Sequence, residues 1–173
     1  MKIVDLSQPI YSGMKVYPGD PRVEVTEAGR YEVEGWVLRT ITMGTHTGTH
    51  VDAFSHMDES GESLDHIPLD RFFGSARLVV PGRSIPKKVG LIFHKDPGIN
   101  FLESILAAGP PFVAGPISES LQRALLEKKI VTYTDLVNLD RLPKDREFMF
   151  YGFPLKIKNG DGSPVRAVAI IED

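Results

Sequence analysis

The pattern of apolar and polar positions predicts a chain built mainly from short strands. Residues 22–27 alternate, which is typical of a half-buried strand, and residues 2–6 and 35–43 are rich in β-forming side chains. Further on, short apolar runs predict buried strands. These later candidates cover residues 76–80, 89–93, 112–114, 130–133, 147–153 and 165–171.

Two segments between the later strands are predicted to be helical. Residues 99–108 end before Gly109 and two prolines, and residues 118–129 begin with Ser118, a suitable N-cap. Helices placed between strands allow crossover connections on one side of a sheet. The expected fold class is therefore α/β, with a mixed sheet and few helices in a single domain over residues 1–173.

Composition narrows the classes of function. The 173 residues carry a formal charge of −3 with no dense basic run, so the sequence offers no electrostatic surface for nucleic acid. The absence of cysteine excludes thiolate metal sites. No stretch approaches the roughly 20 apolar residues of a membrane span, and the opening MKIVDLS is a poor signal peptide. We expect a cytoplasmic protein that does not bind membranes.

The segment HTGTHVDAFSH concentrates residues that bind metals. It contains His46, His50, Asp52 and His56, and therefore three of the five histidines in the chain. All four lie at even positions, so they would share one face of an extended chain. Imidazole and carboxylate ligands together suit Zn, Mn or Fe(II). The alternative interpretation is that they are ordinary polar residues of a loop.

This segment also resembles a family signature. It is similar to the His-x-Gly-Thr-His-x-Asp-x-Pro-x-His motif of the cyclase-like metal-dependent hydrolases, which include kynurenine formamidase and isatin hydrolase. The stretches DLSQPIYSGMKVYPGDP, SLDHIPLDRFFGSARLV and FPLKIKNGDGSPVRAVAI are similar to other parts of that family. Together these segments span most of the chain.

The resemblance implies a metal held by His46, His50 and Asp52. It implies that His56 is a general acid/base or a ligand of a second metal. It also implies the family's swivelling β/β/α fold and a homodimer or homotetramer acting on a small molecule.

The sequence departs from the family pattern at three positions, and the region before Gln122 is shorter than usual, with AGPISES where the family often has an Asp-containing loop. Phe54 replaces the motif proline, and Gln122 and Thr134 align where kynurenine formamidases have a His and a Glu. A glutamine can offer its amide oxygen to a metal, whereas threonine is a poor ligand. We therefore expect one divalent metal, Zn or Mn, with Gln122 as a possible ligand or as a residue just behind the ligands. The alternative is that Gln122 is a solvated helix residue.

The expected activity is hydrolysis of a small amide, formamide, lactam or lactone by a metal-activated water. His56 would take the proton of this water and return it to the leaving group. Tyr17 would form an aromatic wall beside the substrate, the alternative being a packed core residue. Asp161 and Arg166 flank Gly162-Ser163-Pro164 and fit turn chemistry best, the alternative for Arg166 being a role in substrate or subunit contacts. The alternative function is a non-catalytic or degenerate member that binds a metal or small ligand.

Overall fold

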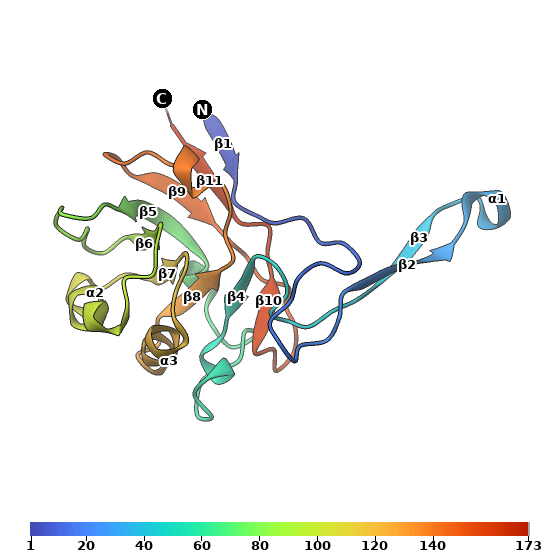
Figure 1. Cartoon of the computed structure of the whole chain (residues 1–173), viewed down its shortest axis with the longest axis horizontal. Helices are drawn as coiled ribbons and strands as arrows, with labels where there is room; N and C mark the ends of the chain where they lie inside the picture. The colour runs from blue at the N-terminus through green and yellow to red at the C-terminus, as the bar shows by residue number, and fades with distance from the viewer. Residues whose placement is uncertain (173) are drawn as a thin grey trace.

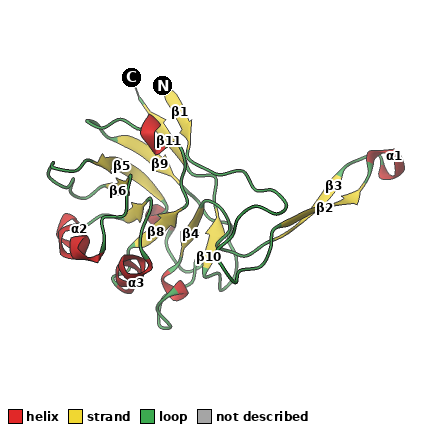
Figure 2. Cartoon of the chain, in the orientation of Figure 1, coloured by secondary structure: helices red, strands yellow, loops and turns green. Residues whose placement is uncertain are grey.

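A curled mixed sheet forms the body of the molecule in the computed structural model, which describes residues 1–172. Among these residues, nine strands pair in the order β1-β11-β9-β5-β6-β7-β8-β4-β10, and Figures 1 and 2 show the arrangement. The strands are β1 Lys2–Asp5, β4 His50–Asp52, β5 Phe73–Val79, β6 Gly90–Phe93, β7 Phe112–Ala114, β8 Val131–Thr134, β9 Phe148–Tyr151, β10 Gly162–Pro164 and β11 Val168–Ile171.

The centre of the sheet is parallel. Strands β5, β6, β7 and β8 run in one direction. Helix α2, Leu102–Ala108, connects β6 to β7, and helix α3, Glu119–Glu127, connects β7 to β8. Both helices lie on the same side of the sheet (Figure 1). The predicted α/β class, both late helices and their position between strands are confirmed.

Within residues 1–172, four 3₁₀ turns lie in the connections between strands, and the two longer helices have defined caps. Helix α2 is capped at its C-terminus by Gly109, which adopts the left-handed conformation, and Ser118 occupies the N-cap position of α3 without a side-chain hydrogen bond. The 3₁₀ turns are η1 Phe54–His56, η2 Leu69–Arg71, η3 Ile99–Phe101 and η4 Leu139–Arg141.

Both edges of the sheet are antiparallel, and one edge was not anticipated. At the first edge β1 pairs with β11, as the predicted strands allow. At the second edge β10 pairs with β4, with Gly162 opposite Asp52. The composition around Asp161 and Gly162-Ser163-Pro164 predicts a turn, because each of these residues favours turns. Tertiary pairing with β4 overrides that local preference and brings the C-terminal part of the chain to the His-rich segment.

The core packs aromatic side chains against the central strands. Phe112, Tyr133 and Phe150 are fully buried, and their ring centroids lie 4.8–5.6 Å apart. Gly90 on β6 leaves space for Phe112, since a Cβ at Gly90 would lie 2.1 Å from its Cζ. The glycine is therefore part of the packing of the core.

A two-stranded arm projects from this body. It consists of β2 Glu24–Gly29, the short helix α1 Tyr31–Glu34 and β3 Leu38–Thr42, and Figure 1 shows it extending away from the sheet. The strands at 22–27 and 35–43 are confirmed. The half-buried alternation holds at the start of the first one, where Val23 is buried and Val25 partly buried between exposed polar residues. The rest of the ribbon is largely exposed on both faces.

No helix within residues 1–172 is long and apolar enough to cross a membrane.

Candidate metal centre

Turns, rather than one extended strand, bring the His-rich segment together. Only His50–Asp52 forms a strand, β4. His46 lies in a turn before it, and Gly48 between them has φ 60°, a conformation that favours glycine. His56 ends the 3₁₀ turn η1. The expectation that four even positions share the face of one extended chain was therefore wrong, although the side chains do converge.

Asp52 is the centre of this convergence. Its side chain is fully buried, and its Oδ2 accepts hydrogen bonds from Gln122 Nε2 at 2.7 Å and Thr132 Oγ1 at 2.8 Å. Its Oδ1 faces His46 Nδ1 at 2.9 Å and His50 Nε2 at 3.4 Å. Two neutral donors thus fix one carboxylate oxygen and leave the other directed at two imidazole nitrogens.

The hydrogen bonds of His50 determine which of its nitrogens is available. His50 Nδ1 lies 2.7 Å from the carbonyl oxygen of Gly48, which can only accept, so Nδ1 carries a proton. In the neutral ring, Nε2 then keeps its lone pair and points toward Asp52 Oδ1. Thr134 Oγ1 lies 3.0 Å from the same Nε2.

A divalent metal fits this donor set. Lone pairs of His50 Nε2 and Asp52 Oδ1 face each other, and either protons or a metal must separate them. Two ligands of one Zn at about 2.0–2.2 Å lie roughly 3.4 Å apart in a tetrahedron, and the observed separations are 2.9 and 3.4 Å. His46, Asp52 and His56 also offer donor atoms that all lie within 4.8 Å of one another.

The pKa shifts of Asp52, His46 and His50 also favour a cation at this site. Burial would raise the pKa of Asp52, but hydrogen bonds with His46 and His50 outweigh it and hold the pKa far below its usual range. Burial would lower the pKa of both histidines, yet contact with Asp52 raises both. The buried carboxylate is thus ionised and requires positive charge beside it.

Asp161 is a site residue that the sequence interpretation missed. Its Oδ2 lies 3.1 Å from His46 Nε2 and 4.0 Å from His56 Nδ1. The residue immediately precedes β10, and its backbone carbonyl accepts a hydrogen bond from Ala53 N–H at 2.8 Å. The available signal was a carboxylate beside Gly162-Ser163-Pro164, but nothing local indicated pairing with β4. Arg166, by contrast, forms an ion pair with Asp5.

His56 lies against His46 and is partly exposed. The two ring centroids are 3.8 Å apart, with the planes tilted by 31°. Burial lowers the pKa of His56, and the neighbouring His46 lowers it further. A neutral His56 carries a free lone pair at neutral pH, which is the state required of a proton acceptor.

Gln122 and Thr134 both reach the cluster. Gln122 is 9% exposed and donates to Asp52, so the interpretation of a solvated helix residue was wrong. Its amide nitrogen, rather than its oxygen, faces the carboxylate. Thr134, opposite His50 in the β4–β8 register, contacts the ring of that histidine. In this structure both residues orient the cluster.

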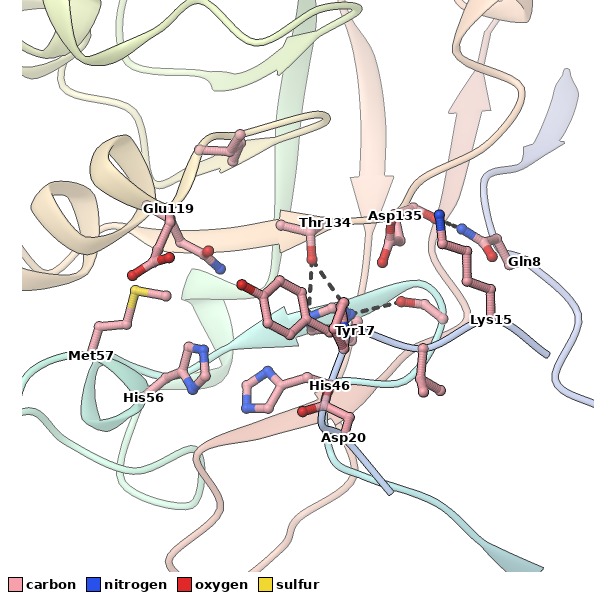
Figure 3. A pocket seen from close by; sticks show the side chains of 16 residues that line it. Gln8, Lys15, Tyr17, Asp20, His46, His56, Met57, Glu119, Thr134 and Asp135 are labelled. Carbon is pink, nitrogen blue, oxygen red and sulfur yellow. Dashed lines mark hydrogen bonds between the residues drawn. The ribbon is translucent and has the colours of Figure 1, made fainter. Parts of the chain in front are cut away.

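A pocket of about 740 Å³ opens over the cluster. His46, His50, His56 and Gln122 contribute to its lining, as does Tyr17, and Figure 3 shows the tyrosine together with the His46 and His56 rings. Tyr17 is 70% exposed, so the alternative of a packed core aromatic was wrong. The tyrosine stands at a pocket of small-molecule size.

Known proteins match the chain along nearly its whole length. A kynurenine formamidase from Salinibacter ruber is 31% identical, with 97% of each chain covered. The chain belongs to the cyclase-like family of metal-dependent hydrolases. The family model described as putative cyclase matches residues 4–87. A kynurenine formamidase from Geobacillus thermodenitrificans is 28% identical, with 95% of each chain covered.

Solved structures of cyclase-like proteins share the fold. Isatin hydrolase A from Labrenzia aggregata bound to benzyl benzoate superposes with a TM-score of 0.82 at 24% identity, covering 99% of this chain and 94% of that one. A structure described as a potential metal-dependent hydrolase with cyclase activity gives 0.77 at 21% identity, covering 99% and 98%. The resemblance found in the sequence is confirmed, and with it the expectation of a metal-dependent hydrolase.

Proposed function

We propose that this cyclase-like hydrolase cleaves a C–N or ester bond in a small amide, formamide, lactam or lactone, with one divalent metal held by His46, His50 and Asp52. The observation that carries the proposal is the direction of Asp52 Oδ1 toward a nitrogen of each histidine. The names of its relatives, kynurenine formamidase and isatin hydrolase, supply the substrate class.

The metal is Zn or Mn, because imidazole and carboxylate donors suit both. We propose one metal per chain, because Gln122 and Thr134 are neutral side chains that are already engaged with Asp52 and with the His50 ring, so neither provides a charged ligand for a second ion. When bound, such a metal polarises a carbonyl oxygen and acidifies water at neutral pH.

The protein side chains then position the reactants and move protons. Gln122 and Thr132 fix Asp52 through Oδ2. His56, neutral because burial lowers its pKa, accepts a proton from the attacking water and donates it to the leaving nitrogen or oxygen. Tyr17 at the pocket rim provides an aromatic surface for an aryl substrate.

Metal analysis followed by a hydrolysis screen tests this function. Purified protein is expected to hold about one Zn or Mn per chain by elemental analysis. It is then assayed with an aryl formamide, isatin and a simple lactone, with and without a chelator. Turnover that the chelator abolishes and added metal restores supports the proposal. Bound metal without turnover of any substrate would favour a degenerate binding protein instead.

We also propose a homodimer or homotetramer, in which the arm contacts another copy of the chain. Large apolar side chains of the arm are exposed, among them Trp36 at 63% and Leu38 at 55%. An isolated two-stranded ribbon is only marginally stable in water, and exposed apolar clusters commonly mark protein interfaces. Light scattering coupled to size-exclusion chromatography gives the mass of the assembly directly. A monomer at all concentrations would contradict this proposal.

A further inference from the structure

Several contacts hold Asp161 at the edge of the site formed by His46, His50 and Asp52. Thr45 Oγ1 donates a hydrogen bond of 2.9 Å to its Oδ1. Its backbone carbonyl binds Ala53 N–H, and the next residue, Gly162, lies opposite Asp52 in the β10–β4 register. Contacts from both sides of the His-rich segment therefore fix a carboxylate that comes from the far C-terminal part of the chain.

The ring of His46 is enclosed by this arrangement. Asp52 Oδ1 faces Nδ1 at 2.9 Å, and Asp161 Oδ2 faces Nε2 at 3.1 Å. The backbone of Gly162 covers the ring, because a Cβ added there would lie 2.3 Å from His46 Cε1. The two nitrogens thus face two different carboxylates, which defines the rotation of the ring.

The two carboxylates cannot have the same role. Nδ1 of His46 and Nε2 of His50 both face Asp52 Oδ1, so a metal beside Asp52 is reached through Nδ1. Nε2 lies on the opposite side of the ring and is left to donate its hydrogen. Its acceptor is Asp161, whose side chain is 49% exposed and keeps its own hydrogen bond to Thr45.

We propose that Asp161 is a positioning residue of the metal centre, which accepts the Nε2–H of His46 and thereby presents Nδ1 to the metal. This inference rests on the proposed ligands His46, His50 and Asp52. A carboxylate behind a ligating histidine fixes its tautomer and makes the coordinating nitrogen more basic. Replacing such a partner commonly weakens metal affinity by about 10–100-fold.

The test compares Zn affinity of the full chain by titration calorimetry for the native protein, Asp161→Ala, Asp161→Asn and Asp70→Ala. We expect Asp161→Ala to weaken binding by about 10–100-fold. Asp161→Asn should lose less, because its amide oxygen still accepts the Nε2–H. Asp70 is exposed and lies outside the pocket lining, so Asp70→Ala controls for the loss of one negative charge.

Nitrogen NMR of the histidine rings provides a readout that a purely structural defect would not give. In the native protein the His46 signal should show Nε2 protonated, and Asp161→Ala should shift this signal. The melting temperature of the metal-free variant, measured with a chelator present, should equal that of the metal-free native protein. Equal affinity of Asp161→Ala and the native protein would overturn the inference alone. A loss in Asp161→Asn as large as in His46→Ala would also overturn it, because Asp161 would then be a ligand. No Zn binding by the native protein would overturn the proposed function as well.

Discussion

The two ends of this molecule differ in how far their strands are buried. At the β4–β10 edge, residues of short strands are almost completely buried around Asp52. In the arm, nearly every position of β2 and β3 is exposed. Alternation predicts the extended backbone of the arm and β10 has the composition of a turn, so neither pattern reveals which strands find a second layer.

The difference teaches that burial here depends on the partner surface. The body covers its sheet with its own helices α2 and α3, whereas no element of residues 1–172 covers the apolar side chains of the arm. We interpret the body as the part that holds the chemistry and the arm as the part that recognises another copy. Changes in one region should then leave the property of the other region intact.

The largest expected effect is on stability in the body. Phe112→Ala removes a fully buried ring that packs on Tyr133 and Phe150, and should lower the free energy of unfolding by about 3–5 kcal/mol. Ile41→Ala in the arm removes a side chain that is 55% exposed, and should change it by less than about 0.5 kcal/mol. Urea unfolding of dilute protein measures both. A similar cost for Ile41→Ala would show that the arm packs on the body.

The next effect is on catalysis alone. His56→Ala should lower hydrolysis by on the order of 100-fold, the usual scale for a general acid–base residue, while Zn binding stays nearly normal. Calorimetry and the substrate assay are run on the same preparation. Collapse of the metal affinity would make His56 a ligand, and unchanged hydrolysis would remove it from the mechanism. Light scattering should give the native mass in either case.

The third effect is on assembly alone. Replacing Trp36, Val37 and Leu38 together with serine should weaken self-association about tenfold or more, because these exposed side chains form an apolar surface on the arm. Melting of the body, measured at a concentration where all variants are monomeric, should not change. Sedimentation showing native assembly in the variant would contradict a role for the arm.

The smallest effect concerns the Arg166–Asp5 ion pair beside the first edge of the sheet. Arg166 Nε and Nη2 lie 2.9 and 2.7 Å from the two carboxylate oxygens of Asp5. Both groups are exposed, so Arg166→Ala should lower the free energy of unfolding by less than any other change described here. The Arg166 hydrogen bond lowers the pKa of Asp5. The stabilisation is therefore present above the unfolded pKa of about 3.9 and lost as the pH falls through the lower folded pKa. Acid unfolding curves that differ most at pH 2 would be inconsistent with this.

The sequence predicted most strands because their apolar runs are buried by neighbours close in the chain, as in β6 and β7. It also singled out His46, His50, Asp52 and His56. It did not predict β10, since its glycines and proline have turn preferences that only pairing with β4 overrides. For the same reason Asp161 was interpreted as a turn residue. Contacts that join positions more than a hundred residues apart leave no periodicity in the sequence.

The position of the arm could not be predicted either. Its alternation is that of an ordinary strand, and exposure follows from the absence of a covering layer, which is a property of the whole chain. Tyr17 illustrates the opposite case. The sequence around Tyr17 is compatible with both a core residue and a substrate wall, and only the packed structure places the side chain at the pocket.

The contact between Gly90 and Phe112 constrains the order in which this core can change over evolution. A methyl group at position 90 has no room while the buried phenyl ring is present, since the two would approach to 2.1 Å. Shrinking Phe112 first would open a cavity that Gly90→Ala could then partly fill. The two substitutions should therefore be strongly non-additive, each harmful alone and less harmful together. Any path of single substitutions that replaces both residues passes through a less stable protein. Gly90 and Phe112 should therefore be kept or replaced together.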